Sequence, residues 1–382
     1  MPWKELCALD LRNKMITDWL SKEFSVTELS GRYDVSRKTV YKWIERYQEL
    51  GFKGLGGLSR APRACPNETP KEVVKVILDL KRRKMNWGPK KIIARLRMDQ
   101  PGVKWPADST GHDILKRHGF VKSRKYRHHT PPYTEPFLGC ETPNQVWSAD
   151  YKGHFRMGDG KQCYPLTISD NNSRYLLGCW GLSRATFEQT QPCFEWVFRH
   201  NGLPDAIRTD NGAPFASVGL GGLSRLSVWF IQLGIRPERI EPGCPEQNGR
   251  HERMHRTLKE ETASPPKGNL QAQQKAFNRF LREYNNERPH EALGQKPPAS
   301  VYCSSPRPFP GKPRKVEYDT RTTVRYVHPN GCIKWNGDEV YLSQSLAGEY
   351  VSLQQIGDCL WAVAYSFHPL GILDEMGKKI QP

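Results

Sequence analysis

The stretch Val146-Trp147-Ser148-Ala149-Asp150 opens a predicted β-strand over residues 146–155 and carries a carboxylate on it. A strand over 206–209 then delivers Asp210 to its C-terminal end, the edge where ligands bind in open α/β sheets. Between these two strands the sequence predicts a hairpin turn, two strands and a helix, at 158–160, 163–168, 175–181 and 187–198. The segment is therefore predicted to be an α/β domain with two carboxylates at one edge of its sheet.

A third carboxylate, Glu252, lies in the motif Gln247-Asn248-Gly249-Arg250-His251-Glu252-Arg253 on a predicted helix. Carboxylates gathered from distant parts of a chain are typical of a divalent-metal site, and hard oxygen ligands suit Mg²⁺ or Mn²⁺. Two such ions can stabilise an in-line displacement at phosphorus. Each acidic residue alone fits a turn, cap or ion-pair role equally well, but together they predict a metal-dependent enzyme that acts on phosphodiesters.

The charge of the chain agrees with a polyanionic partner. The 382 residues carry a formal net charge of +18, and residues 1–139 hold 29 Lys and Arg against 15 Asp and Glu. Attraction to DNA is therefore expected mainly at the N-terminal end. The ten cysteines form no Cys-x-x-Cys pair, which argues against a zinc knuckle. With no signal peptide or membrane span in the sequence, a cytoplasmic, nucleoid-associated protein is expected.

Residues 25–48 predict two short helices around a tight turn, the pattern of a helix-turn-helix. Ser25 and Ser36 are the expected N-caps, and Asp34 is the expected left-handed turn residue. The start of the second helix is expected to meet a DNA major groove. The residues predicted to contact DNA there are Arg37, Lys38, Thr39 and Lys42. The alternative is an ordinary helical hairpin with a solvated basic face.

A weaker copy of this arrangement is predicted over residues 67–130. Its helices are expected to begin at Thr69-Pro70, at Pro89, and at Ser109 or Thr110. A plain three-helix bundle that spaces other domains explains this half equally well. Two basic, Pro-containing segments are interpreted as linkers that follow a DNA backbone or minor groove, at 51–66 and 121–136.

The C-terminal part is predicted to be a separate β domain. A Pro-rich basic run at 305–315 predicts a domain boundary. Beyond it, apolar and polar residues alternate between turns at Asn330-Gly331 and Asn336-Gly337, which predicts a small β-barrel. A dimerisation module is nearly as well supported. The glycine-rich residues 219–222 lack a following Gly-Lys-Ser/Thr, so they predict a flexible loop and no nucleotide site.

The motifs of residues 140–302 resemble the integrase core of bacterial insertion-sequence transposases and retroviral integrases, the DDE class with a ribonuclease H-like fold. Five motifs carry the resemblance in order along the chain: 146–150, 164–174, 210–215, 242–259 and 284–290. The resemblance implies that Asp150, Asp210 and Glu252 form the catalytic, metal-binding triad. It also implies two Mg²⁺ ions as cofactors and a contact between Lys259 and the DNA end.

The choice of Glu252 over Glu246 is a separate prediction. Glu246 has the spacing from Asp210 that is often associated with this class, but it follows Pro245 at the mouth of a loop. Glu252 is preferred because the helix would carry further polar groups beside it at i+3, i+4 and i+7: His255, Arg256 and Lys259. The last two are predicted to contact DNA.

Three other polar residues of this region are assigned different roles. Asp170 lies beside Asn171, Asn172 and Ser173 and is predicted to be a turn residue. His251 and His255 are predicted to make DNA-phosphate or packing contacts, because Mg²⁺ prefers oxygen ligands.

The predicted protein is a multidomain DDE transposase. Its domains are expected to be two all-α helix-turn-helix domains, an α/β ribonuclease H-like integrase core and a small C-terminal β-barrel, at 1–60, 67–130, 140–302 and 316–376. It is expected to bind the double-stranded ends of a mobile DNA element and to catalyse metal-dependent cleavage and strand transfer. Concerted joining of two ends implies at least a dimer on DNA, and no membrane partner is expected. A catalytically inactive DNA-binding repressor and a ribonuclease H are the alternatives.

Overall fold

The computed structural model describes residues 7–57, 67–121, 140–217, 220–241 and 249–381. The chain divides into two compact units, Met1–Glu68 and Thr69–Pro382. In the part of the chain that is described, no helix is long and apolar enough to cross a membrane.

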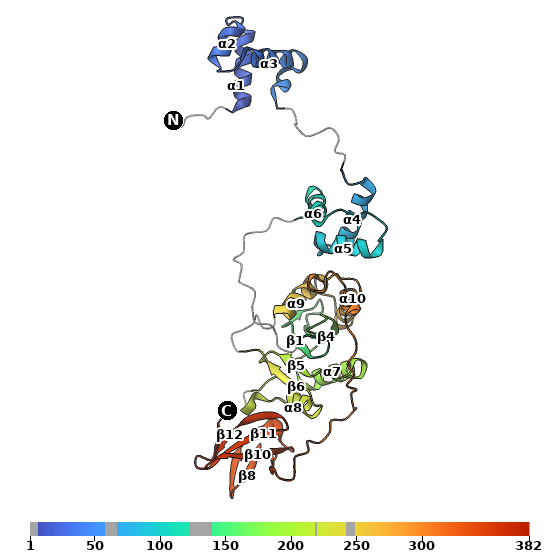
Figure 1. Ribbon diagram of the computed structural model, residues 1–382, viewed down its shortest axis with the longest axis vertical. Coiled ribbons are helices and arrows are strands. Elements are labelled where there is room, and N and C mark those ends of the chain that lie inside the picture. Colours follow the sequence, from blue (N-terminus) through green and yellow to red (C-terminus); the bar gives the residue numbers. More distant parts are fainter. Residues whose placement is uncertain (1–6, 58–66, 122–139, 218–219, 242–248, 382) are drawn as a thin grey trace. The chain divides into compact units, whose positions relative to one another are not determined.

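The first unit contains three α-helices, α1 (Ala8–Leu20), α2 (Val26–Arg32) and α3 (Arg37–Leu50) (Figure 1). The predicted caps are confirmed: the backbone N–H of Glu28 donates to Ser25 Oγ, and that of Thr39 donates to Ser36 Oγ. Asp34 has a φ of 48°, so it is the left-handed turn residue. The predicted helix-turn-helix therefore corresponds to α2 and α3.

Two features of this unit were not predicted. Helix α1 supplies Met15 and Ile16 to the buried core formed with α2 and α3. Residues 51–55 were predicted to begin a linker, but they form a 3-10 helix, Gly51–Leu55, whose Leu55 is completely buried in the same core. That prediction was wrong because one apolar side chain holds the segment against the helices. The rest of the predicted linker, 58–66, lies outside the described residues.

The second unit begins with helices α4 (Lys71–Arg83), α5 (Pro89–Asp99) and α6 (Asp108–Arg117). The expected starts are confirmed to within a few residues, with Pro89 in the first turn of α5. Helix α6 is followed by Gly119, whose φ is 75°. These helices enclose their own core, which includes Ile77, Ile93 and Ile114. Of the predicted linker 121–136, all but the first residue lies outside the described residues.

The central domain is built on a mixed sheet. Its strands are β1 (Val146–Tyr151), β2 (Phe155–Arg156), β3 (Gln162–Asp170), β4 (Leu176–Leu182), β5 (Ala206–Thr209) and β6 (Arg236–Arg239). The order across the sheet is β4-β3-β1-β5-β6, with β2 paired to the start of β3. Strand β3 is antiparallel to β1 and β4, whereas β1, β5 and β6 run parallel. The predicted strand 146–155 is thus two strands.

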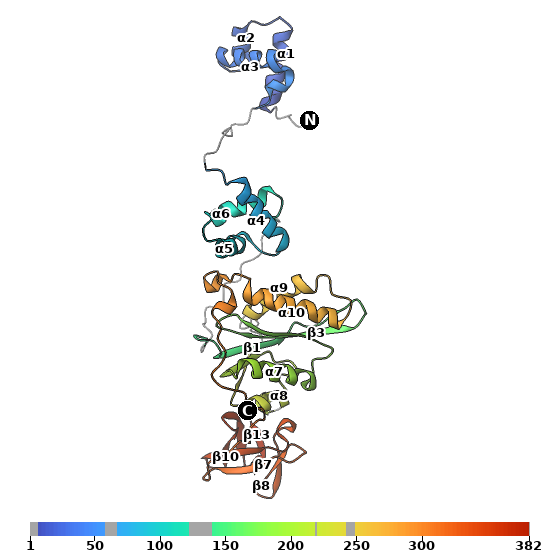
Figure 2. The ribbon, with the colours of Figure 1, turned by 90° about the vertical axis from the view of Figure 1, so that its right-hand side faces the viewer.

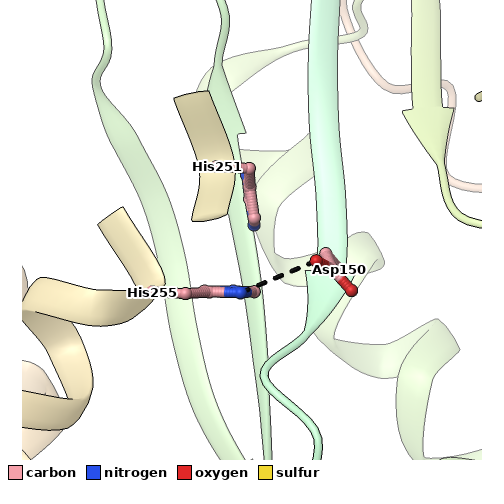
Figure 3. A group of neighbouring side chains, drawn as sticks. All are labelled: Asp150, His251 and His255. Atoms are coloured by element: carbon pink, nitrogen blue, oxygen red, sulfur yellow. Dashed lines mark ion pairs between the residues drawn. The ribbon is translucent and has the colours of Figure 1, made fainter. Parts of the chain in front are cut away.

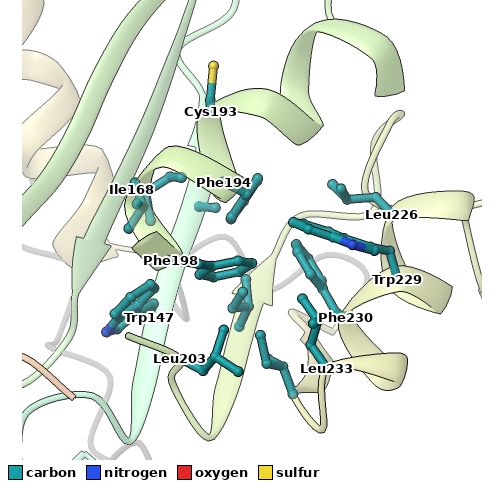
Figure 4. Close-up of a cluster of buried hydrophobic side chains, with 14 of the residues drawn as sticks. Trp147, Ile168, Cys193, Phe194, Phe198, Leu203, Leu226, Trp229, Phe230 and Leu233 are labelled. Atoms are coloured by element: carbon teal, nitrogen blue, oxygen red, sulfur yellow. The ribbon is translucent and has the colours of Figure 1, made fainter. Parts of the chain in front are cut away.

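Helices cover both faces of this sheet (Figure 2). On one face lie α7 (Phe187–Asn201) and α8 (Arg225–Gln232), on the other α9 (Gly249–Thr262) and α10 (Leu270–Asn286). The first pair packs aromatic rings against the strands (Figure 4), and the ring centroids of Trp147 and Phe198 lie 6.0 Å apart. The second pair buries Met254, Leu258 and Phe277 against β3 and β4. The two layers fix the strand ends that carry Asp150 and Asp210.

The C-terminal strands form open sheets instead of the predicted barrel. One sheet has the order β13-β12-β11-β10-β7, and a separate pair is β8-β9. Their bounds are β7 Thr323–Tyr326, β8 Cys332–Trp335, β9 Asp338–Tyr341, β10 Tyr350–Gly357, β11 Leu360–Tyr365, β12 His368–Asp374 and β13 Lys379–Gln381. A barrel requires its edge strands to pair with each other, and β7 and β13 do not. The glycines of both predicted turns, Gly331 and Gly337, do have positive φ.

Two connecting segments are more ordered than their composition predicts. The start of the run 305–315 is fastened to the central domain, because the N–H of Leu203 donates to the carbonyl of Arg307 at 2.8 Å. In the predicted flexible loop, the described residues Leu220–Gly222 form a 3-10 turn. The Arg239 guanidinium donates to the carbonyls of Gly221 and Gly222. In both cases the hydrogen-bond partner lies far away in the sequence, so local composition does not reveal it.

Candidate metal and DNA site

The two predicted aspartates occupy equivalent positions on neighbouring parallel strands. Ser148 of β1 lies opposite Arg208 of β5, and Asp150 and Asp210 each follow two residues later. Adjacent strands are about 4.8 Å apart, so the strand pairing brings the two carboxylates to the same edge of the sheet. The structure therefore supports the sequence argument that placed them together.

The electrostatics of Asp150 reflect this crowding. Its pKa is raised to about 7, first by burial and then by the negative charge of Asp210, with a further contribution from Glu252. Burial also raises the pKa of Asp210, although the N–H of Gly212 donates to its carboxylate at 3.2 Å. The charge of Glu252 on helix α9 is the smallest of these contributions. Among the described residues, the three predicted carboxylates do not form a group whose ligand atoms all lie within 4.8 Å of one another, whereas Asp150, His251 and His255 do.

A second group of potential ligands surrounds the same aspartate. One ligand atom each from Asp150, His251 and His255 lies within 4.8 Å of the others (Figure 3). His255 Nδ1 is 3.6 Å from Asp150 Oδ2. Thr167, which faces Asp150 across the β1–β3 pair, has its Oγ1 2.7 Å from His251 Nε2 and 2.6 Å from His255 Nε2. Ser169 Oγ lies 3.0 Å from His251 Nδ1.

Counting protons limits the directions that the hydrogen bonds of this network can take. A threonine hydroxyl has a single proton, and a neutral imidazole has one N–H and one acceptor nitrogen. If His255 Nδ1–H points at the Asp150 carboxylate, then Thr167 donates to His255 Nε2 and accepts from His251 Nε2–H. His251 Nδ1 then accepts from Ser169. In this arrangement the donors run from Ser169 toward Asp150, and the last contact, 3.6 Å from His255 to Asp150, is longer than a hydrogen bond. The Thr167 hydroxyl also lies 3.2 Å from the backbone carbonyl of Asp150, and donation to that carbonyl would leave Thr167 only as an acceptor for the two histidines.

Burial keeps both imidazoles neutral. Burial lowers the pKa of His251 to about 3, and burial followed by the charge of His251 lowers the pKa of His255 well below its usual range. Each residue is only 2% exposed. The predicted contact of these histidines with DNA phosphates was therefore wrong, while the packing alternative describes them correctly. Sequence reasoning missed their shared partner, Thr167.

Helix α9 has a buried face and an exposed face, and His255 lies on the buried face and not beside Arg256 and Lys259 as predicted. His251, Met254, His255 and Leu258 form the buried face. Glu252, Arg256 and Lys259 are exposed, so the predicted DNA-contacting side chains are accessible and His255 is not among them. The i, i+3, i+4, i+7 spacing of the four buried residues was a readable signal of that face.

Two further acidic residues, Asp170 and Glu246, were assigned roles from the sequence. Asp170 is a turn residue as predicted: its Oδ2 accepts from the N–H and the Oγ of Ser173 at 2.7 and 2.6 Å. Its Oδ1 accepts from the N–H of Asn144 at 2.8 Å. Glu246 lies outside the described residues, so its comparison with Glu252 stays a prediction.

The predicted DNA-contacting residues of α3 lie at its start. Arg37, Lys38 and Lys42 are exposed, and Thr39 is half-buried. The Thr39 hydroxyl lies 2.9 Å from Ser36 Oγ, within the N-cap. Three cationic side chains are thus available at the helix start, and Thr39 has a structural hydrogen bond in addition.

Models of known domain families match this chain in two regions. Two models, each described as an integrase core domain, match residues 141–245 and 233–298. A helix-turn-helix domain model matches residues 11–63, and a homeodomain-like domain model matches residues 39–115.

Two curated relatives come from bacterial insertion elements. The insertion element IS476 uncharacterized 39.2 kDa protein of Xanthomonas euvesicatoria is 28% identical over 260 residues, which cover 64% of this chain and 69% of the relative. The insertion element IS407 uncharacterized 31.7 kDa protein of Burkholderia multivorans is 27% identical over 164 residues, which cover 41% and 54%.

Among solved structures, the magnesium complex of the HTLV-2 integrase catalytic core (trimeric form) is 18% identical, covering 42% of this chain and 97% of that one, with a TM-score of 0.34. The simian T-cell lymphotropic virus intasome with the PP2A regulatory subunit B56 gamma is 18% identical, covering 77% and 97%, with a TM-score of 0.38.

The family models thus place an integrase core domain and helix-turn-helix domains in one chain, the combination that the sequence predicted. The two relatives add that the chain is similar to proteins of bacterial insertion elements.

Proposed function

We propose that this protein is an active DDE transposase, which cleaves the DNA ends of a mobile element and transfers them to target DNA with the help of divalent cations. Asp150, Asp210 and Glu252 are its proposed catalytic and metal-binding residues. Mg²⁺ or Mn²⁺, with two ions at work, is the proposed cofactor.

One observation carries the proposal. Asp150 and Asp210 occupy equivalent positions on adjacent parallel strands, and the charges of both Asp210 and Glu252 raise the pKa of Asp150. Carboxylates that repel one another in a partly buried site are stabilised together by a divalent cation. Structural ion-pair networks contain basic partners, whereas this group is predominantly acidic.

The donor chemistry favours these three carboxylates over the group of Asp150, His251 and His255. Mg²⁺ prefers oxygen ligands. The Nε2 atoms of both histidines are already occupied by the hydroxyl of Thr167. When bound, the cations would polarise the scissile phosphodiester and lower the pKa of the attacking hydroxyl.

The protein's own residues would position both the site and its substrate. The histidine network holds Asp150 from inside the domain. The exposed Arg256 and Lys259 lie on the same helix as Glu252, where they would bind phosphates of the DNA end. The start of α3 would bind the element end in a major groove. Because two ends are joined, we propose at least a dimer on DNA.

The proposal is tested with Asp150→Asn and Asp210→Asn in a strand-transfer assay on pre-cut duplex ends. Each change removes a charge that holds the cations, so activity should fall by about 10³-fold or more, at roughly 1.4 kcal/mol per tenfold. Binding of the same DNA should stay near wild type. Asp159→Asn, the same chemical change in the exposed hairpin turn, is the matched control. Full activity in either site variant, or none in the wild type, would contradict the proposal and favour a DNA-binding repressor.

A further inference from the structure

A second polar site lies beside the N-terminal turn of α9, and its character is cationic. It is a hollow of about 330 Å³, compared with roughly 30 Å³ for one water molecule. The central domain lines it with four arginines and one histidine: Arg174, Arg250, Arg253, Arg288 and His290. These side chains come from the segment between β3 and β4, from α9, and from the segment after α10.

The acidic groups near these cations are already paired. Glu291 also lines the hollow, but its Oε1 lies 2.8 Å from Lys90 Nζ. Arg288 pairs with Glu261, with Nη1 2.8 Å from Oε1. Among the described residues, Arg174 and Arg253 form no ion pair: Arg174 donates to the carbonyl of Asn171 at 2.6 Å, and Arg253 donates to that of Gly249 at 3.2 Å. Carbonyl groups satisfy part of the hydrogen bonding of a guanidinium but do not neutralise its charge.

The same hollow holds an unsatisfied polar atom. Among the described residues, the buried His290 Nε2 has no hydrogen-bond partner. The ring of His290 meets that of Tyr284 edge to face, at a centroid distance of 4.8 Å. A buried polar atom without a partner is costly unless a bound molecule supplies one.

The electrostatics show that the cations repel one another. The pKa of Arg174 is lowered to about 10, first by burial and then by the charge of Arg250, and Arg253 lowers it further. The N-terminal end of α9 adds partial positive charge of its own. An anion in the hollow would relieve this repulsion and accept hydrogen bonds from the guanidinium groups.

We propose that this pocket binds a phosphodiester group of the DNA strand that passes Glu252, with Arg174 and Arg253 as its principal ligands. The assignment rests on the proposed function of the central domain. Guanidinium groups match phosphate oxygens in two-point hydrogen bonds. Because Arg253 follows Glu252 directly on α9, a phosphate in the pocket would fix the strand next to the proposed metal site.

The test combines a protein variant with DNA that lacks a single charge. Binding of duplex ends is measured with the full chain in EDTA, using wild type and Arg253→Gln. Each duplex carries one neutral methylphosphonate at a different position. At the position that contacts the pocket, Arg253→Gln alone and the neutral linkage alone should each weaken binding about tenfold. Combining the two changes should weaken binding scarcely more than either change alone, because both remove the same contact. Arg199→Gln, at an exposed arginine on α7, is the control. Its effect on DNA affinity should add to the effect of the neutral linkage at every position.

Independent losses for Arg253→Gln at all positions would overturn the proposal. Inorganic phosphate provides a second arm: at matched ionic strength it should raise the melting temperature of wild type but not of Arg174→Gln. If phosphate stabilises the protein while the DNA losses remain independent, the assignment to DNA is overturned. The binding assay requires no catalysis, so an inactive wild type would sink the proposed function alone. If the wild type is active in strand transfer but the two losses of affinity add at every position, the pocket assignment alone is contradicted.

Discussion

Asp150 has negatively charged neighbours on one side and neutral histidines on the other. At the sheet edge, the charges of Asp210 and Glu252 raise its pKa and so disfavour its ionised form. Toward the interior it meets His255, which Thr167 connects to His251. The interior network therefore orients a carboxylate that the neighbouring charges alone would push aside.

Thr167→Val tests that orientation. The substitution keeps the side-chain volume nearly unchanged but leaves two buried imidazole nitrogens without their partner, at a cost of about 1–3 kcal/mol in stability. Strand transfer should fall more than the lost stability explains, because Asp150 loses its fixed orientation. Thr167→Ser retains the hydroxyl and should recover most of the activity. Equal activity in the valine and serine variants would show that the network does not position the carboxylate.

The raised pKa of Asp150 predicts a pH effect of known sign. The folded pKa of about 7 lies above the ordinary value of about 3.9, so the folded chain binds an extra proton between these limits. The resulting stability is complete below about pH 4 and is lost as pH rises through about 7. In EDTA, the melting temperature of Asp150→Asn should therefore rise relative to wild type between about pH 5 and pH 8.

Buried histidines such as His251 act in the opposite direction, since their pKa values are lowered. They are present in both proteins, so the difference between the two melting curves isolates Asp150. Mg²⁺ should narrow that difference at high pH. A difference that does not vary with pH would contradict the raised pKa.

At the residue scale, the sequence was sufficient to place Asp150 and Asp210, because strand ends can be read from local pattern and parallel pairing aligns them. The role of Thr167 could not be predicted from the sequence. Its role depends on a helix 84 residues away along the chain, and no local pattern specifies which hydroxyl a buried histidine will meet.

At the scale of elements, the assignment of Glu252 on α9 in place of Glu246 is a prediction that can be tested directly. Glu252→Gln should abolish strand transfer, because α9 holds this residue near Asp150 while its buried face packs on the sheet. Glu246→Gln should reduce activity less than about tenfold. A side-by-side assay of both variants, with equal DNA binding as the control, is decisive: loss of activity in Glu246→Gln and retention in Glu252→Gln would mean that the wrong carboxylate was assigned.

Elements that begin with a recognisable cap were predicted, whereas some elements were missed although a local signal was present. The N-caps Ser25 and Ser36 predicted the starts of α2 and α3, because capping depends only on nearby residues. The buried faces of α1 and α10 were not predicted, although Phe277, Phe280 and Tyr284 of α10 have helical spacing. The predicted barrel failed for another reason: alternation identifies strands but not whether the edges of their sheet pair.

At the scale of the whole molecule, charge and chemistry are separated along the chain. Residues 1–139 hold most of the net positive charge, whereas the proposed catalytic carboxylates all lie between residues 150 and 252. The division fits a protein in which one part binds DNA and another acts on it. It also means that loss of catalysis and loss of binding can be produced by different substitutions.

The most direct test of the metal-site assignment is pulsed electron paramagnetic resonance of Mn²⁺ bound to the full chain with a pre-cut DNA end. We predict two ions coordinated by oxygen, with no coupling to a directly bound ¹⁴N nucleus, and loss of both ions in Asp210→Asn. A ¹⁴N coupling that disappears in His255→Ala, together with undiminished binding in Asp210→Asn, would show instead that Asp150, His251 and His255 form the metal centre, and would contradict the assignment of Asp150, Asp210 and Glu252.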